Sequence, residues 1–295
     1  MKRIARVFPR ETKYTPEDGL AFTHGPDFFT PEVDEVHVSC VFTWDKPRAE
    51  KLARQWQSVC SKVFLGGPAY DDPGGEFTPG LYLKPGYVQT SRGCPRKCSF
   101  CFVAKREGRI RELAIHPGPW VLDNNLLACS RSHIDAVFAM LTTQRDVKFL
   151  GGLDARLMDE RVVSLLAGLG TRLRYFYTAY DQPKQMEAVE AAIERCYVGG
   201  LSQKHIGCYV LVGYEGDTPE EADRRCEWVF VQGGQPFAMY YRDSDSLGKR
   251  KPQEWARIVK KWTWQSEIFR HMKADGLKYH TQLRRGILVE KRKCQ

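Results

Sequence analysis

The chain has 295 residues, 42% of them hydrophobic and 27% charged, which is the composition of an ordinary globular protein of one large domain or of one domain with an extension. No apolar run is long enough to span a bilayer, and the basic first residues lack the apolar core of a secretory signal. Ten scattered cysteines are typical of reduced thiols, so we expect a cytoplasmic protein that does not bind membranes.

The positive charge is concentrated at one end of the chain. The whole sequence carries 45 Lys and Arg against 36 Asp and Glu, a net charge of +9. Residues 244–295 contain 14 of the basic and 5 of the acidic residues, so the preceding 243 are balanced. A basic segment beside a neutral body indicates an anionic partner, and nucleic acid is the leading candidate. The alternative is that these charges form a solvated helix face with no partner.

The first 84 residues are expected to form a small extension. Residues 1–34 lack sustained periodicity and are rich in Pro, Gly and Thr, which predicts irregular structure. Residues 35–42 and 62–67 read as strands, and Asp45 can cap a helix between them that has Pro47 in its first turn. Together these elements predict one βαβ unit.

A loop with three cysteines follows the strand predicted at residues 86–90. Cys94, Cys98 and Cys101 are spaced C-x3-C-x2-C, and no fourth Cys or His stands at the spacing that a tetrahedral zinc site needs. A cubane iron–sulfur cluster uses one ligand for each iron, so three cysteines would leave one iron open for chemistry.

At these residues the sequence resembles the radical S-adenosylmethionine (SAM) superfamily. Phe100 stands directly before the third cysteine, and the run of residues 90–101 is most similar to the cobalamin-dependent and methylthiotransferase branches. The resemblance implies a [4Fe–4S] cluster that chelates and reductively cleaves SAM, yielding a 5′-deoxyadenosyl radical that abstracts hydrogen from a substrate. It also implies a flavodoxin- or ferredoxin-type reductant. The alternatives are a zinc loop, or a cluster kept for structure or electron transfer alone.

Cobalamin itself is not expected. The extension looks like a remnant of the cobalamin domain that this branch carries, but the sequence has no D-x-H-x-x-G signature. Too few residues precede Cys94 to build the complete domain.

Strands and helices alternate from Gly86 onward, the pattern of a parallel sheet with crossover helices. The strands are expected at residues 86–90, 120–123, 147–152, 174–178, 208–212 and 236–241. Helices are expected at residues 133–141, with Ser130 or Ser132 as the cap, from 159, at 183–196, and from 218, where residues 218–221 form a capping box. The connection at 106–118 is expected to be mostly loop. The fold class is therefore α/β, and six such repeats make a partial (β/α)6 TIM barrel, the radical SAM core, over residues 85–243.

Ligands of parallel barrels bind at the carboxyl ends of the strands, and that rule selects candidate SAM-binding residues. With Phe100 of the cluster loop they are Asp123, Asn124, Asn125, Gly151, Gly152, Asp154, Thr178, Tyr180, Gly213, Glu215, Tyr240 and Arg242. Residues 123–125 replace the usual Gly-Gly-Glu-like motif of the family and would hold the SAM ammonium. The turn at residues 213–218 resembles the family turn whose strand packs near adenine.

Several of these positions have alternative interpretations. Asp154 would bind a ribose hydroxyl or the substrate, or else be a turn or cap residue. Asp181, beside Thr178 and Tyr180, would face the barrel mouth or cap the following helix. Arg242 would pair with the SAM carboxylate, or with Asp243 or Asp245 in a structural ion pair.

Four further cysteines fall in or beside predicted barrel elements: Cys129, Cys196, Cys208 and Cys226. Buried free thiols are the expected reading, with an auxiliary cluster as the alternative.

The last segment, residues 244–295, predicts a basic helical end. Trp255, Val259, Trp262, Phe269 and Met272 stand at helical spacing, and the aromatic residues are expected to pack on the barrel. The helix is expected to end at Gly276, and basic residues gather at 249–251, 284–285 and 291–293.

The combined interpretation is a radical SAM enzyme whose substrate is a nucleobase in nucleic acid or, alternatively, a peptide or small metabolite. The alternative from a different functional class is a non-catalytic iron–sulfur protein that binds nucleic acid. The reaction type and the residues that act on the substrate are not indicated by the sequence.

Overall fold

The computed structural model describes residues 2–242, 251–263 and 268. By its contacts the chain divides into two compact units, Met1–Gln144 and Arg145–Gln295. The domain boundary expected after residue 84 lies inside the first unit, and the one expected after residue 243 lies among residues outside the described part. Within the described part, no helix combines the length and the apolar character needed to cross a membrane.

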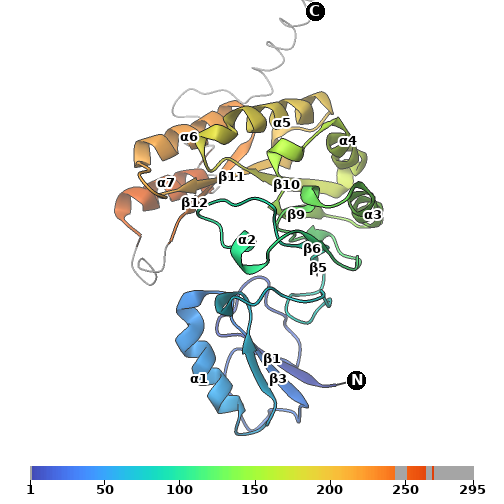
Figure 1. The fold of residues 1–295 in the computed structure, drawn as a ribbon, viewed down its shortest axis with the longest axis vertical. Helices are drawn as coiled ribbons and strands as arrows, with labels where there is room; N and C mark the ends of the chain where they lie inside the picture. The colour runs from blue at the N-terminus through green and yellow to red at the C-terminus, as the bar shows by residue number, and fades with distance from the viewer. Residues whose placement is uncertain (1, 243–250, 264–267, 269–295) are drawn as a thin grey trace, which may run out of the picture. The chain divides into compact units, whose positions relative to one another are not determined.

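The first unit begins with a parallel sheet whose strands run in the order β2-β1-β3-β4 (Figure 1). These strands are β1 (Ile4–Val7), β2 (Ala21–Phe22), β3 (Glu35–Ser39) and β4 (Val63–Gly66). Helix α1 (Lys46–Trp56) joins β3 to β4, so the predicted βαβ unit is confirmed. Leu52 and Trp56 of α1 are buried in one apolar core with Val36 and Val38 of β3.

The prediction that residues 1–34 are irregular is wrong, because β1 and β2 lie there. Strand β1 is only four residues long and has Arg6 in its middle, so no apolar pattern marks it. The Arg6 side chain is buried because its guanidinium donates to Leu20 O and Gly80 O and pairs with Asp18. The strand forms because β1 pairs in parallel with β3 and because Arg6 contacts residues far along the chain.

Asp45 stands at the N-cap of α1, but its side chain makes no capping hydrogen bond. Both of its carboxylate oxygens instead accept from Arg10, each at 2.8 Å. The predicted helix start is therefore confirmed, whereas the predicted capping role of the side chain is wrong.

The first unit also contains the elements around the cysteine loop. They are the parallel pair β5 (Tyr87–Val88) and β8 (Trp120–Val121), the antiparallel pair β6 (Ser91–Arg92) and β7 (Arg111–Glu112), and helices α2 (Val103–Arg106) and α3 (Arg131–Thr142). Ser130 caps α3 by accepting from His133 N. Of residues 106–118, only Arg106, the end of α2, and the two residues of β7 are regular, so the expectation of a mostly irregular connection is confirmed.

The second unit repeats strand and helix. Its strands are β9 (Val147–Gly152), β10 (Leu173–Ala179), β11 (Ile206–Val212) and β12 (Gln235–Tyr240), parallel and in the order β12-β11-β10-β9. Its helices are α4 (Glu160–Gly168), α5 (Met186–Val198), α6 (Pro219–Val231) and α7 (Gln253–Thr263). Asp159 and Thr218 cap α4 and α6 through their side chains. All six predicted strands are thus present, and the α/β class with parallel strands is confirmed.

Short 3-10 helices punctuate both units: η1 (Thr43–Asp45), η2 (Pro68–Tyr70), η3 (Leu126–Ala128), η4 (Ala155–Leu157), η5 (Gly170–Arg172), η6 (Pro183–Gln185) and η7 (Gln203–His205). The described strands are compatible with a partial α/β barrel, and no closed barrel is formed by them.

Helix α7 packs on the second unit through its tryptophans. Trp255 and Trp262 are buried, and the Trp262 indole N–H and the Lys261 ammonium both donate to Asp223 of α6. The expected packing is confirmed for these two residues. The rest of that prediction lies outside the described residues: Phe269, Met272, the end at Gly276, and the basic residues 249–250, 284–285 and 291–293.

Candidate functional site

The cysteine loop is closed at its base by β6 and β7. In the antiparallel register of these strands, Arg92 lies opposite Arg111. Beyond them, Cys94 N donates to Gly108 O at 3.2 Å. Gly93 has a φ of +85°, and a Cβ there would lie 2.3 Å from Arg109 O. Only glycine permits both that backbone conformation and so close an approach, so the Arg-Gly step before Cys94 is required by the shape of the loop.

The thiols of this loop differ from the other thiols of the chain. All nine described cysteines are free, and six of them are buried. Cys94 and Cys98 are partly exposed, and Cys101 is exposed. Because the thiolate is the form that binds metal, exposure on a loop suits these three to be ligands.

The remaining cysteines behave as the buried free thiols that the sequence predicts. Burial raises the pKa of Cys129 to about 11 and that of Cys196 to about 12. It also raises the pKa of Cys208 and of Cys226. Across the residues that the structure describes, no three Cys, His, Asp or Glu side chains converge into a metal-holding group, the loop trio included.

Asn125 follows β8 and reaches the cysteine loop. Its Nδ2 donates to Cys94 Sγ at 3.5 Å, and the backbone N–H of Arg96 donates to the same sulfur at 3.5 Å. The Asn125 side chain is buried, and its Oδ1 has no hydrogen-bond partner among the described residues. A buried acceptor without a donor is uncommon in native proteins, so this oxygen fits a ligand with an N–H group. Asn125 thus presents a buried, unmet acceptor beside Cys94.

Asp123 is engaged by the chain itself. It is 2% exposed, and its carboxylate accepts from Thr90 N (2.7 Å), Thr90 Oγ1 (2.6 Å) and Ser91 Oγ (2.7 Å). Burial raises the pKa of Asp123, and these hydrogen bonds oppose that rise. The carboxylate thus fixes the segment that leads into the cysteine loop.

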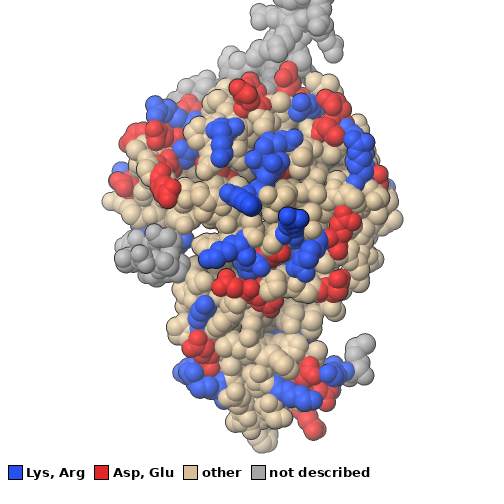
Figure 2. All heavy atoms as spheres, viewed as in Figure 1, with Lys and Arg blue, Asp and Glu red and all other residues tan. Residues whose placement is uncertain are grey.

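Glu107 organises the same loop, although the sequence analysis did not single it out. Its Oε2 accepts from Gly93 N at 3.1 Å and from Asn124 Nδ2 at 2.6 Å, and its Oε1 accepts from Arg106. The signal that would have found it is charge, because Glu107 is the single acidic residue between positions 95 and 111, which contain six Lys or Arg. Figure 2 shows Lys and Arg side chains gathered over the loop that carries α2.

In the second unit, the end of β9 presents Gly151, Gly152 and Asp154. Asp154 caps η4 by accepting from Arg156 N, and both of its oxygens accept from the Arg156 guanidinium, at 2.7 and 3.0 Å. Asp154 thus has the geometry of a cap residue, the second of its two interpretations. Gly151 and Gly152 are partly buried.

The end of β10 presents residues of different character. Thr178 is 1% exposed, and its Oγ1 has no hydrogen-bond partner among the described residues. Tyr180 is buried, with its ring centroid 4.9 Å from that of Trp228 on α6, which leaves it little surface for a ligand. Asp181 Oδ1 accepts from Leu211 N at 3.0 Å, and burial raises the pKa of Asp181 to about 6.

The alternative that Asp181 caps the next helix is wrong, because the N-cap residue of η6 is Gln182, which forms a capping box with Gln185. Gln185 Oε1 accepts from Asp181 N at 2.7 Å and from Gln182 N at 2.8 Å.

The turn after β11 is held by an ion pair that the sequence analysis missed. Gly213 N donates to Asp217 Oδ2 at 2.8 Å, and both Asp217 oxygens accept from Arg225, each at 2.8 Å. The bidentate pair fixes the turn, and Glu215 is left exposed on it.

After β12, Lys251 Nζ lies 5.2 Å from the ring centroid of Tyr240, and Arg242 is exposed. The alternative partners of Arg242, Asp243 and Asp245, lie outside the described residues.

The structure thus brings Asn124 and Asn125 together with the cysteine loop inside the first unit, whereas the candidates from residue 151 onward belong to the second. No protein-family model matches the chain, and no curated protein sequence matches it either.

Proposed function

We propose that the chain is a radical SAM enzyme whose [4Fe–4S] cluster is held by Cys94, Cys98 and Cys101. The observation that carries this proposal is that these are the only described thiols that are not buried, and that all three lie on one loop. The loop offers three thiolates, one fewer than a structural zinc site uses.

Asn125 provides the second line of support. Its amide donates to the sulfur of Cys94, and hydrogen bonds to sulfur are one means by which proteins tune such clusters. Its unpartnered Oδ1 would accept from the ammonium group of SAM, which is the role expected for residues 123–125. Asp123 supports this site indirectly, by fixing Thr90 and Ser91.

When bound, the cluster would supply the electron that cleaves the sulfonium C–S bond of SAM and releases a 5′-deoxyadenosyl radical. The chain holds the loop in place through Gly93 and Glu107. The six basic residues around the loop would attract an acidic electron donor of the flavodoxin or ferredoxin type.

The experiment is anaerobic reconstitution of the full-length chain, followed by dithionite reduction with SAM. We expect about four irons per chain and formation of 5′-deoxyadenosine and methionine, measured by chromatography. The triple variant Cys94→Ala, Cys98→Ala, Cys101→Ala should lose both. Ser99→Ala, an exposed change in the same loop, should keep both.

Two results would count against the proposal in different ways. Unchanged iron content in the triple variant would remove the cluster assignment. A full cluster without SAM cleavage would favour the non-catalytic iron–sulfur protein. A nucleobase in nucleic acid remains a predicted substrate on the strength of the basic C-terminal end, most of which lies outside the described residues.

A further inference from the structure

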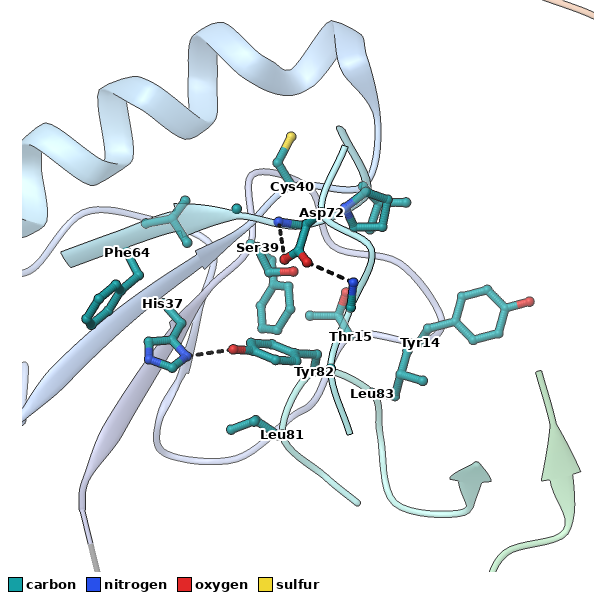
Figure 3. Close-up of a pocket in the computed structure, with 18 of the residues that line it drawn as sticks. Tyr14, Thr15, His37, Ser39, Cys40, Phe64, Asp72, Leu81, Tyr82 and Leu83 are labelled. Atoms are coloured by element: carbon teal, nitrogen blue, oxygen red, sulfur yellow. Dashed lines mark hydrogen bonds between the residues drawn. The ribbon is translucent and has the colours of Figure 1, made fainter. Parts of the chain in front are cut away.

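A cavity of about 890 Å³ lies within the first unit (Figure 3). It is lined by the residues that directly follow β1, β3 and β4, among them Phe8, Val41 and Gly67. The strand order puts β1 and β3 side by side with their connections leading to opposite sides, which makes this the topological switch point of the sheet. Ligands of open parallel sheets bind at that place, at the carboxyl ends of the strands.

Among the described residues, no helix covers one face of this sheet. Val36 and Val38 of β3 are buried in the core with α1, whereas the alternate residues Glu35, His37 and Ser39 line the cavity. Parallel sheets are normally covered on both faces. Here the loop that carries Leu81, Tyr82 and Leu83 lines the opposite wall and leaves a space between.

The wall of the cavity is aromatic and exposed. Phe64 is 55% exposed, Val41 53% and Tyr82 40%. The rings of His37 and Tyr82 are stacked, with centroids 6.0 Å apart and planes at 26°, and Phe64 meets His37 edge-on at 5.3 Å. In Figure 3 the His37 and Tyr82 side chains are joined by a 2.6 Å hydrogen bond between Nδ1 and the hydroxyl. Large apolar side chains left open around one hollow indicate a ligand, and flat rings favour a flat one.

The charge of the lining sets the charge of that ligand. Five carboxylates line the cavity against two arginines: Glu35, Asp45, Asp72, Glu76 and Glu107 against Arg10 and Arg92. Three of the carboxylates are already paired: Asp45 with Arg10, Glu35 with Lys2 and Glu107 with Arg106. Asp72 accepts only from backbone N–H groups, those of Gly67 at 3.3 Å and Gly74 at 2.8 Å, so the wall keeps more negative than positive charge. An anionic molecule would meet a net negative wall, so a neutral or cationic one is favoured.

The cavity extends to the base of the cysteine loop. Arg92, Glu107 and Leu122 line it, and Glu107 accepts from Gly93 N, one residue before Cys94. Arg92 Nε also donates to Gly75 O at 3.1 Å, and Arg111 Nη2 donates to Gly74 O at 3.1 Å. The strands that close the cysteine loop thus hold the loop that borders the cavity.

We propose that this cavity binds a planar heteroaromatic molecule without net negative charge. That this molecule is the substrate, which would make it a small metabolite rather than a nucleic acid, rests on the proposed function. Binding itself depends only on the cavity, so the two statements are tested separately.

The binding test uses three probes with one ring and different charges: indole, tryptamine and indole-3-acetate. Calorimetry with the full-length chain is expected to show tryptamine and indole binding, each at least tenfold tighter than indole-3-acetate. Ser39→Trp fills the cavity from the open face of β3, and Phe64→Ala removes part of the aromatic wall; each should weaken tryptamine binding at least tenfold. Phe28→Ala is the matched control, because Phe28 is 96% exposed and lies outside the cavity.

Equal or tighter binding of indole-3-acetate, no binding of any probe, or equal binding by wild type and both cavity variants would overturn the inference. SAM cleavage with no probe binding removes the cavity site and leaves the proposed function standing. Probe binding without SAM cleavage removes the proposed function and leaves the cavity site standing.

Discussion

Replacing Asp123 with Ala separates two roles that an acid at a strand end can have. If the carboxylate held the SAM ammonium, the chain would lose a cofactor contact and little else. The structure instead places three donors of the chain on it, from Thr90 and Ser91. Thr90 and Ser91 are both fully buried, so water does not replace the lost acceptor.

The size of the effect follows from these contacts. Leaving a buried donor without a partner costs about 1–3 kcal/mol, and removing the buried carboxylate recovers part of its own burial cost, so we expect a net loss of about 3 kcal/mol. For a unit of this size, that predicts a melting temperature lower by about 6–12 °C. Asp154→Ala is the comparison, because it removes an N-cap and the pair with Arg156, which together should cost about 1–2 kcal/mol.

The assay is a thermal melt of the cluster-free chain, together with iron content and SAM affinity after reconstitution. Asp123→Ala should melt early and retain less iron, because Thr90 and Ser91 lead into the cysteine loop. A variant that melts within 2 °C of the wild type, by the scale of roughly 2–4 °C per kcal/mol, yet loses SAM affinity would show that the reasoning is wrong and that the carboxylate serves the cofactor.

Two further predictions concern charge. Asp181 has a pKa raised to about 6 by burial, so the stability that its neutral form contributes is complete below about pH 4 and is lost as the pH rises through 6. The variant Asp181→Asn does not titrate, so its free energy of unfolding relative to the wild type should grow by at most about 3 kcal/mol between pH 4 and pH 7. Urea denaturation midpoints of the two proteins should therefore diverge over this range. Midpoints that stay parallel would contradict the raised pKa of Asp181. For the basic end, reversing the charge of Arg284, Arg285, Lys291, Arg292 and Lys293 should flatten the slope of log K against log salt for DNA binding by up to about 4.5, at about 0.9 per phosphate contact. Equal slopes for wild type and variant would remove the support for a nucleic-acid partner.

The parts of the fold that the sequence predicts are those decided by near neighbours. Ser130, Asp159 and Thr218 cap helices by accepting from a backbone N–H three residues on, so the signal and its partner lie within one turn. The strand at Val147–Gly152 is likewise marked by an apolar run that ends in glycines.

The parts that the sequence does not predict depend on partners far along the chain. Arg6 is buried in β1 because Gly80, 74 residues away, accepts from its guanidinium. Asp123 meets its donors 32 and 33 residues away, so its pattern in the sequence is the same whether it binds the chain or a ligand. Asp181 does not cap the next helix because its carboxylate accepts from Leu211 N, 30 residues away, and the helix begins with a capping box of Gln182 and Gln185.

These contacts refine the rule that polar residues at the ends of parallel strands bind ligands. Asp123, Asp154 and Asp217 stand at such ends, and the chain itself occupies the oxygens of each. Asn125 and Thr178 stand at the same kind of position, and each has a buried oxygen with no partner in the described part of the chain. Because a buried polar atom without a partner is costly, an unmet oxygen is a stronger sign of a ligand than a carboxylate is. Each unit has one such oxygen, and in the first unit Asn125, rather than Asp123, is the better residue at which to test for a SAM contact.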